Sequence, residues 1–207
     1  MLKNRQLRDK EATQKKILQA FERLVARDGL HRVGINAISR EAGVDKVLVY
    51  RYFGGVPQLL AALASQQPLW PSFEDVIGTN ALGAADLSAE ELAFRFLSGL
   101  VRELRKRPLS LAVLRAELVE KNPLTIELSR AREKWAEDML EYLQSAGISA
   151  DSMAPVAAIL SAGLLHLLLN SALADAFGGV DSKSDDGRKK MDEVVRRMVR
   201  ALIRDLT

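Results

Sequence analysis

The sequence predicts an all-α fold of about nine helices. Apolar side chains recur with the 3.6-residue period of amphipathic helices in most segments of the 207-residue chain. Glycine, proline and capping residues separate these segments. No segment is convincingly patterned as a strand, and we find neither an internal repeat nor a low-complexity tract. Apolar residues make up 48% of the chain, which is ample for a buried core.

A first helix is predicted over residues 13–25. Its apolar side chains recur at i, i+4, i+7 and i+8, which places them on one face. They are Ile17, Phe21, Leu24 and Val25. Asp28 and Gly29 follow as a helix stop, because glycine readily adopts the conformation that ends a helix.

Two shorter helices follow, with a turn between them. Residues 35–42 carry apolar side chains on one face, and Gly43 permits a sharp turn after them. Asp45 is suited to cap a third helix over residues 46–53. The local propensity of this last stretch is that of a strand, but a lone strand would leave its backbone groups unpaired. We therefore predict a helix there, and with it a helix-turn-helix unit.

The rest of the chain predicts the remaining helices. Pro57 suits the first turn of a fourth helix, which reaches about Gln67. A loop rich in Gly, Asn and Asp is expected to continue to about Leu87, where a capping box begins at Ser88 and opens a helix that ends before Pro108. Later helices are predicted over residues 109–121, 123–147 and 151–177, and after a polar loop at 178–187.

The last two predicted helices are strongly apolar. Residues 151–177 are apolar on nearly all sides, which implies that protein covers them. The last helix has an apolar stripe opposite a row of arginines. If two copies of the chain met across a two-fold axis, the last two helices of each copy would cover the apolar surfaces of the other. An ordinary internal core is the competing interpretation of the apolar stripe. The expected dimer-interface residues are Leu164, Leu168, Val195, Met198, Val199 and Leu202.

Composition excludes several classes of function. The chain has no cysteine and two histidines, which excludes disulfides and thiolate chemistry and argues against the common zinc sites. No phosphate loop or paired-carboxylate arrangement is evident, so a small helical enzyme lacks support, and we expect no catalytic residue, metal or cofactor. The charged N-terminus and the lack of a long apolar run argue against a signal peptide or a membrane span, and predict a cytoplasmic protein.

Positive charge is concentrated at the N-terminal end. Residues 1–53 contain 12 Lys and Arg against 6 Asp and Glu, whereas residues 54–207 contain 18 against 21. Clustered cations favour a polyanionic partner. A solvated, helix-supporting face is the alternative interpretation of the charge alone.

The run from Ile35 to Phe53, with Asp28-Gly29 before it and a helix from Pro57 after it, resembles the N-terminal DNA-binding domain of TetR-family transcriptional regulators. The Ala42-Gly43-Val44 turn, Tyr50 and the Tyr52-Phe53 end fall at the family's motif spacing. The similarity covers roughly residues 10–60, and the rest of the chain agrees in helix count and order. It implies a DNA-binding domain at residues 1–55 and a ligand-binding and dimerisation domain at 56–207.

The resemblance also implies roles for individual residues in binding a double-stranded DNA operator. Lys46 would reach a base edge or a phosphate, while Val47 and Leu48 would contact thymine methyl groups. Val33-Gly34 stands where family members often carry Thr or Ser, so Asn36 or the free amides would hold a phosphate there. The remaining contacts implied are Tyr50 and Arg51 at the groove and its wall, Tyr52 at a phosphate, and Arg5 and Arg8 as an arm ahead of the first helix.

At the level of the molecule, the resemblance implies a homodimeric repressor that leaves a palindromic operator when an unknown small-molecule inducer binds its C-terminal domain. The expected ligand-binding residues are Phe96, Arg115, Glu117, Trp135, Tyr142 and His166, with Phe94 and Asn170 as further candidates. Arg115 and Glu117 could instead face solvent, and His166 could form a hydrogen bond at the dimer contact. A DNA-binding protein without an inducer, acting architecturally or through a protein partner, is the alternative.

Overall fold

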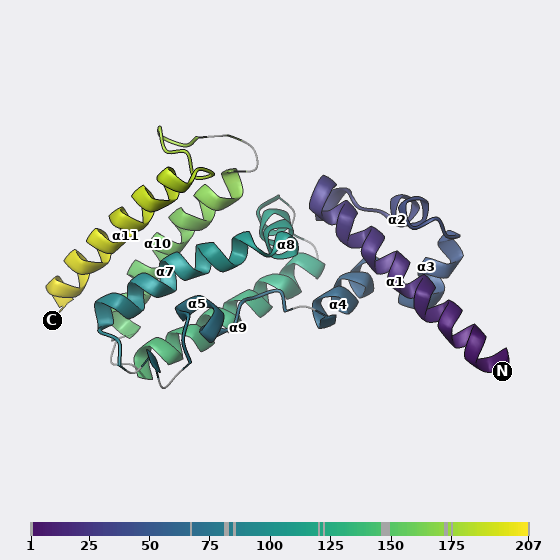
Figure 1. The fold of residues 1–207 in the computed structure, drawn as a ribbon, viewed down its shortest axis with the longest axis horizontal. Coiled ribbons are helices and arrows are strands. Elements are labelled where there is room, and N and C mark those ends of the chain that lie inside the picture. Colours follow the sequence, from purple (N-terminus) through teal and green to yellow (C-terminus); the bar gives the residue numbers. More distant parts are fainter. Residues whose placement is uncertain are drawn as a thin grey trace. The chain divides into compact units, whose positions relative to one another are not determined.

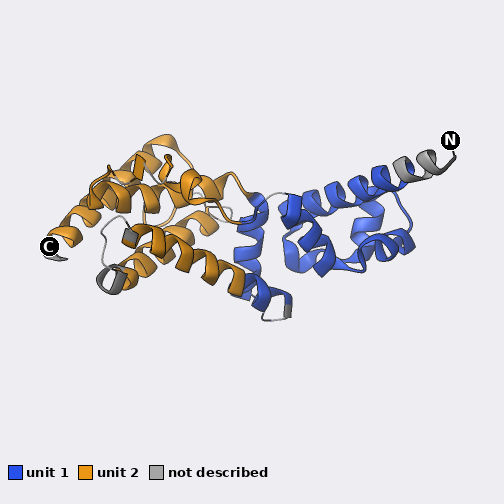
Figure 2. Ribbon diagram, turned by 90° about the horizontal axis from the view of Figure 1, so that it is seen from below, with its two compact units in different colours: residues 1–69, 108–129 blue, residues 70–107, 130–207 orange. Residues whose placement is uncertain are grey.

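The computed structural model is all-α, as predicted (Figure 1). It describes residues 2–206 except 67, 81–82, 85, 120, 122, 146–149, 172–173 and 175. This part of the chain contains ten α-helices, one short 3-10 helix and an isolated β-bridge between Phe177 and Val180. The chain forms two compact units, which Figure 2 shows in different colours.

Unit 1 comprises residues 1–69 and 108–129 and contains the predicted helix-turn-helix. Its central helix is α1, which packs against α2, α4 and α8. The elements of this unit are α1 (Leu2–Asp28), η1 (Leu30–Arg32), α2 (Ile35–Ala42), α3 (Lys46–Phe53), α4 (Val56–Gln66), α8 (Pro108–Val119) and the first residues of α9 (Pro123–Ser145).

The core of unit 1 is formed by apolar side chains from several of its helices. Ile17 and Phe21 of α1, Ile38 of α2, Val49 of α3 and Leu59 of α4 are all fully buried. Each such side chain stabilises the fold by about 1.5–3 kcal/mol relative to leaving it exposed. Packing of this kind determines the conformation of α3, whose local propensity alone would favour a strand.

Unit 2 comprises residues 70–107 and 130–207. Here α7 is central and packs against α5, α10 and α11. The elements of this unit are α5 (Phe73–Ile77), α7 (Ala89–Arg105), the rest of α9, α10 (Ala150–Asn170) and α11 (Asp185–Leu206). Leu92, Phe96 and Leu104 of α7 are buried, and their spacing places them on one face of the helix.

The short helix α5 lies within the stretch predicted to be a loop. Ser72 caps it in a reciprocal capping box with Asp75, and Phe73, Val76 and Ile77 are buried. Five helical residues between prolines and a glycine are too few for a periodic pattern, which is why the prediction missed the helix.

Other boundaries differ from the predictions at helix ends. α1 begins at Leu2 instead of residue 13, α10 ends at Asn170, and α11 begins at Asp185 inside the predicted polar loop. The predicted end of α9 at Gly147 lies outside the described residues.

The compact units are divided differently from the predicted functional domains. Helices α4 and α8 lie beyond residue 55, yet both pack against α1 in unit 1. The functional boundary at residues 55 and 56 stays a prediction.

Within the described residues, no single helix is both long and apolar enough to cross a membrane. Among the described helices, α3 and α4 taken together reach that length and composition, and the pair is bent by 61°.

Candidate nucleic-acid interface

The turn between α2 and α3 is held by backbone and side-chain hydrogen bonds. Gly43 has φ 65°, a left-handed conformation that side chains other than glycine adopt rarely. The amide of Val44 donates to the carbonyl oxygen of Ser39 at 3.0 Å. Asp45 caps α3, since its Oδ1 accepts a hydrogen bond from the amide of Val47 at 2.7 Å. The predicted cap and turn are both present.

Helix α3 has one buried face and one exposed face. Val49 is fully buried, and Val44 and Phe53 are half-buried beside it. On the other side, Val47 is 53% exposed and Tyr50 is 54% exposed. Large apolar surface is unfavourable in water unless a partner covers it. This exposed face is therefore a candidate contact surface.

The other residues predicted to contact DNA are distributed around this exposed face. Lys46 and Arg51 are exposed, whereas Leu48 and Tyr52 are half-buried. The Nζ atom of Lys10, on α1, lies 5.9 Å from the centre of the Tyr52 ring. This cation beside Tyr52 was not predicted, because the two residues are far apart in the sequence and only the packing of α1 brings them together.

Helix α2 presents an uncapped N-terminus. Its N-cap residue is Gly34, which makes no side-chain hydrogen bond to the first turn, and Asn36 is exposed there. Uncapped amides and the positive end of a helix dipole attract anions such as phosphate. The far end of α2 is tied to α1, because Glu41 pairs with Arg23 at 2.9 Å and with Arg27 at 3.8 Å.

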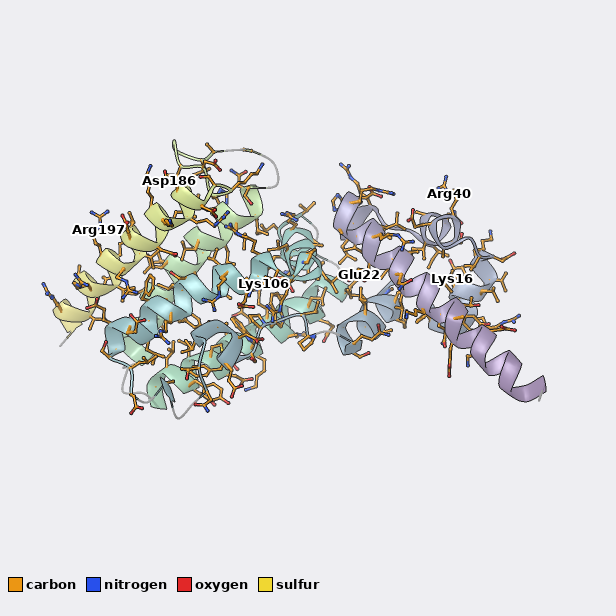
Figure 3. The ribbon with its side chains drawn as sticks, viewed as in Figure 1. Lys16, Glu22, Arg40, Lys106, Asp186 and Arg197 are labelled. Atoms are coloured by element: carbon orange, nitrogen blue, oxygen red, sulfur yellow. The ribbon has the colours of Figure 1, made fainter. Side chains whose placement is uncertain are left out.

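Two exposed cations of unit 1, Lys16 on α1 and Arg40 on α2, are labelled in Figure 3. Arg5 and Arg8 do not precede the first helix, because α1 already begins at Leu2. The prediction of a separate arm is corrected in this respect, and the side chains of both residues lie outside the described part of the chain.

The six predicted ligand-binding residues fall in different units. Arg115 and Glu117 belong to α8 in unit 1, and Arg115 is partly buried, which lowers its pKa. The other four belong to unit 2. Trp135 donates a hydrogen bond to the carbonyl oxygen of Pro71 at 2.7 Å, and Tyr142 stacks on Phe73 with a centroid distance of 4.5 Å.

A small, partly open apolar cavity in unit 2 lies among α7, α9, α10 and α11. Its volume is about 20 Å³, and of the six predicted ligand-binding residues it includes only Phe96. Val199 and Leu202, which were predicted at a dimer interface, also line it. A cavity of this size holds about one water molecule.

The outer side of α10 and α11 carries an open apolar groove of about 530 Å³. Ile159 is 72% exposed and Met198 is 46% exposed in it. Leu164 and Val195 also line the groove, although Val195 is mostly buried. The predicted interface residue Leu168 is 3% exposed.

Two aromatic rings at the edge of this groove contact each other. His166 and Phe177 meet edge to face with a centroid distance of 5.2 Å. Phe177 and Ile159 were not among the predicted interface residues. Because α10 is apolar on nearly all sides, its sequence gives no signal of which stripe is exposed. Within the described residues, no group of three or more acidic or histidine side chains is placed to hold a metal ion.

A turn with glycine and aspartate in these positions, followed by a helix that exposes tyrosine, lysine and arginine, defines a helix-turn-helix DNA-binding protein. Residues 17–63 match the family model described as bacterial regulatory proteins, tetR family. The match lies in the helix-turn-helix region, and it confirms the resemblance to TetR-family regulators that the sequence predicted.

Solved structures of TetR-family regulators share the fold. A TetR-like transcriptional regulator from Rhodococcus sp. RHA1 matches with a TM-score of 0.60 and 19% identity, over 91% of this chain and 96% of that chain. NalD, the secondary repressor of the MexAB-OprM multidrug efflux pump in Pseudomonas aeruginosa, matches with a TM-score of 0.59 and 16% identity. The match covers 92% of this chain and 96% of the NalD chain. SmeT in complex with triclosan matches with a TM-score of 0.58 and 19% identity. The match covers 92% of this chain and 90% of the SmeT chain. No curated protein matches the chain.

Proposed function

We propose that this TetR-family protein is a homodimeric transcriptional repressor that binds a palindromic operator and leaves it when a small molecule binds unit 2. The observation that carries the proposal is the exposed face of α3. There the side chains of Val47 and Tyr50 are exposed to solvent beside those of Lys46 and Arg51. Apolar, aromatic and cationic groups together match the major groove, which offers thymine methyl groups, acceptor atoms and phosphates. A protein that acts on DNA in this way would work in the bacterial cytoplasm.

The role of each side chain follows from its exposure. Lys46 would donate to a guanine edge or a phosphate, and Val47 would contact a thymine methyl group. Leu48 is half-buried, so its contribution would be smaller than that of Val47. Asn36 and the first amides of α2 would hold a phosphate, which positions α3 without reading the sequence.

The small molecule that releases the operator is proposed to enter unit 2 at its apolar cavity. At about 20 Å³ the cavity is far smaller than the roughly 300–1,000 Å³ of sites for drug-sized ligands. A ligand would therefore bind a conformer in which α7, α9, α10 and α11 stand further apart, and would shift the population toward it. SmeT, whose fold this chain shares, is known as a complex with triclosan, and NalD is described as a repressor.

Homodimer formation is supported by the apolar groove on α10 and α11. Side chains such as Ile159 and Met198 would be covered by the same face of a second copy. Two copies related by a two-fold axis would place their α3 helices in successive major grooves of a palindromic site.

The experiment that tests DNA recognition replaces Tyr50 or Lys46 by alanine. An operator is first selected from a random DNA library with the unchanged protein, and affinities are then measured for that operator and for unrelated DNA. Each substitution is expected to weaken operator binding about tenfold or more, since a specific base contact is worth about 1–3 kcal/mol. The dimer should remain intact in sedimentation.

Lys121→Ala is the matched control, because this exposed lysine of unit 1 lies outside the helix-turn-helix. Its operator affinity should be close to that of the unchanged protein. Operator affinity that survives both Tyr50→Ala and Lys46→Ala would exclude α3 as the reading helix. A DNA-binding protein without an inducer is the alternative, and it is favoured if no small molecule that releases the operator also raises the melting temperature.

A further inference from the structure

Helices α7 and α11 of unit 2 pack against each other. Each contributes to a groove between them a stripe of residues at i, i+3, i+4 and i+7 spacing, and these residues are polar apart from Val101. The stripes line an open groove of about 580 Å³ that shares no residue with the apolar cavity described above. The stripe residues are Ser98, Val101, Arg102 and Arg105 on α7, and Asp185, Arg188, Lys189 and Asp192 on α11. Lys106 and Met191 complete the lining.

Away from this groove, the contact between the two helices pairs opposite charges. Arg196 Nη1 lies 2.7 Å from Glu91 Oε2, and Arg200 Nε lies 3.0 Å from Glu90 Oε1. Where the groove begins to be lined by these helices, the Ser98 hydroxyl donates to Asp192 Oδ1 at 2.8 Å. Arg196 and Arg200 of α11 therefore each face an acidic group near the start of α7.

Within the groove, positive and negative side chains are not balanced in this way. The lining has five cations and two carboxylates. Arg102 and Lys106 both donate to the buried carboxylate of Glu103, and Arg188 pairs with Asp185 on its own helix. Among the residues that the structure describes, neither Arg105 nor Lys189 forms an ion pair with a carboxylate.

Arg105 is the most buried of the groove's cations that form no ion pair with a carboxylate among the described residues. It is half-buried, and its Nη2 atom donates to the carbonyl oxygen of Ser182 at 3.2 Å. Burial, and then the nearby charge of Arg188, lower the pKa of Arg105, although Asp192 acts in the opposite direction. Two guanidinium groups held near each other in a partly buried groove create a positive potential that an anion would relieve.

We propose that the groove between α7 and α11 binds a small multivalent anion whose oxygen atoms accept hydrogen bonds from Arg105, Arg188 and Lys189. Arginine donates through a planar fork that fits phosphate and carboxylate groups in a bidentate manner. The volume suits a molecule larger than a single ion. The site is separate from the apolar cavity of the proposed inducer and does not depend on it.

Isothermal titration of the full-length protein with inorganic pyrophosphate and with citrate tests the proposal, at constant ionic strength and with sodium chloride as the reference. Pyrophosphate represents phosphate-bearing ligands and citrate represents carboxylate-bearing ligands. At least one of them is expected to bind saturably with one site per chain. Arg105→Gln and Lys189→Gln should each weaken that binding about tenfold or more, the loss expected for one charge-assisted hydrogen bond.

Arg197→Gln is the matched control, because Arg197 is an exposed cation of α11 outside the groove (Figure 3). It should leave the affinity for the anion unchanged. Lys189 is exposed as well, so its substitution does not threaten folding. The proposal is overturned if neither anion binds, or if Arg105→Gln and Lys189→Gln bind the anion as tightly as Arg197→Gln does.

Discussion

Glu103 shows how strongly a single carboxylate can depend on its neighbours. It is 7% exposed and lies on α7, where Arg102, Lys106 and Arg107 all donate to it at 2.8–3.0 Å. Burial opposes its ionisation, but the hydrogen bonds from Lys106, Arg107 and Arg102 outweigh burial and lower its pKa from 4.5 to about 2. Arg107 also pairs with Asp75 at 2.9 Å, so the cluster joins α7 to α5.

Because folding lowers this pKa, the ionised carboxylate favours the folded state. Its contribution is complete above pH 4.5 and is lost as the pH falls toward about 2. A shift of this size corresponds to roughly 3 kcal/mol. We therefore expect Glu103→Gln to melt at a clearly lower temperature than the unchanged protein at pH 6, and the gap to narrow at pH 3.

Glu193→Gln is the control for this measurement, because Glu193 is exposed on α11. It should change the melting temperature little at either pH. The contrary result is a difference in melting temperature between Glu103→Gln and the unchanged protein that is the same at pH 6 and at pH 3. That result would show that the ionisation of Glu103 does not stabilise unit 2.

At the scale of residues, the sequence predicted which face of α3 is exposed better than which residues line the cavity of unit 2. Val49 could be assigned inward and Tyr50 outward, because one short helix with one anchored face leaves few alternatives. For Arg115 and Trp135 the helical period shows which residues share a face, but not whether that face meets a cavity. The packing of several helices decides this, and their contacts are not local in the sequence.

At the scale of elements, the helix ends with chemical signals were predicted closely and the others were not. Gly43 and Asp45 mark the turn, and α2 and α3 have the predicted bounds. The first turns of α1 lack an apolar stripe, so nothing in the pattern predicted its start at Leu2. The five residues of α5 are helical because of the capping box and the close contact with α7.

Gly99 allows this close contact between α5 and α7. A Cβ atom at residue 99 would lie 1.9 Å from the carbonyl oxygen of Val76, and the backbone there has no freedom to move away cheaply. Gly99→Ala is therefore expected to displace α5 and to reduce the free energy of unfolding by about 1–3 kcal/mol, as overpacking does. Chemical denaturation monitored by circular dichroism measures this loss.

Gly163→Ala on α10 provides the comparison, since a Cβ atom at that position meets nothing within 4 Å in the chain. Gly163 lines the groove of the proposed dimer, so both variants are compared at a protein concentration low enough to give monomers. Alanine is the better helix former by about 1 kcal/mol, so this variant should be as stable as the unchanged protein or more so. Equal stability of Gly99→Ala and Gly163→Ala would contradict the tight packing of α5 on α7.

At the scale of the whole molecule, the proposed dimer depends on the apolar groove of α10 and α11. Met198→Glu places a carboxylate in the groove, which a second copy would have to bury without a partner. Because Met198 is 46% exposed in the single chain, the fold should tolerate the change. We expect sedimentation to show mainly monomers, with a loss of operator affinity because a monomer contacts one half-site.

Ala131→Glu on α9 is the control, because it adds the same charge at an exposed position outside the groove. This variant should sediment like the unchanged protein. If Met198→Glu associates as strongly as Ala131→Glu, the two copies meet through another surface.

The division of the chain into units has a consequence for engineering. Unit 1 is not a continuous stretch, because α8 belongs to it and α8 is encoded between two segments of unit 2. A chimera that grafts residues 1–69 onto the remainder of a relative would bring a foreign α8 against α1, with Leu109 and Val113 replaced by side chains selected for another core. Exchanging operator specificity between such regulators therefore requires transplanting residues 108–129 together with the N-terminal segment.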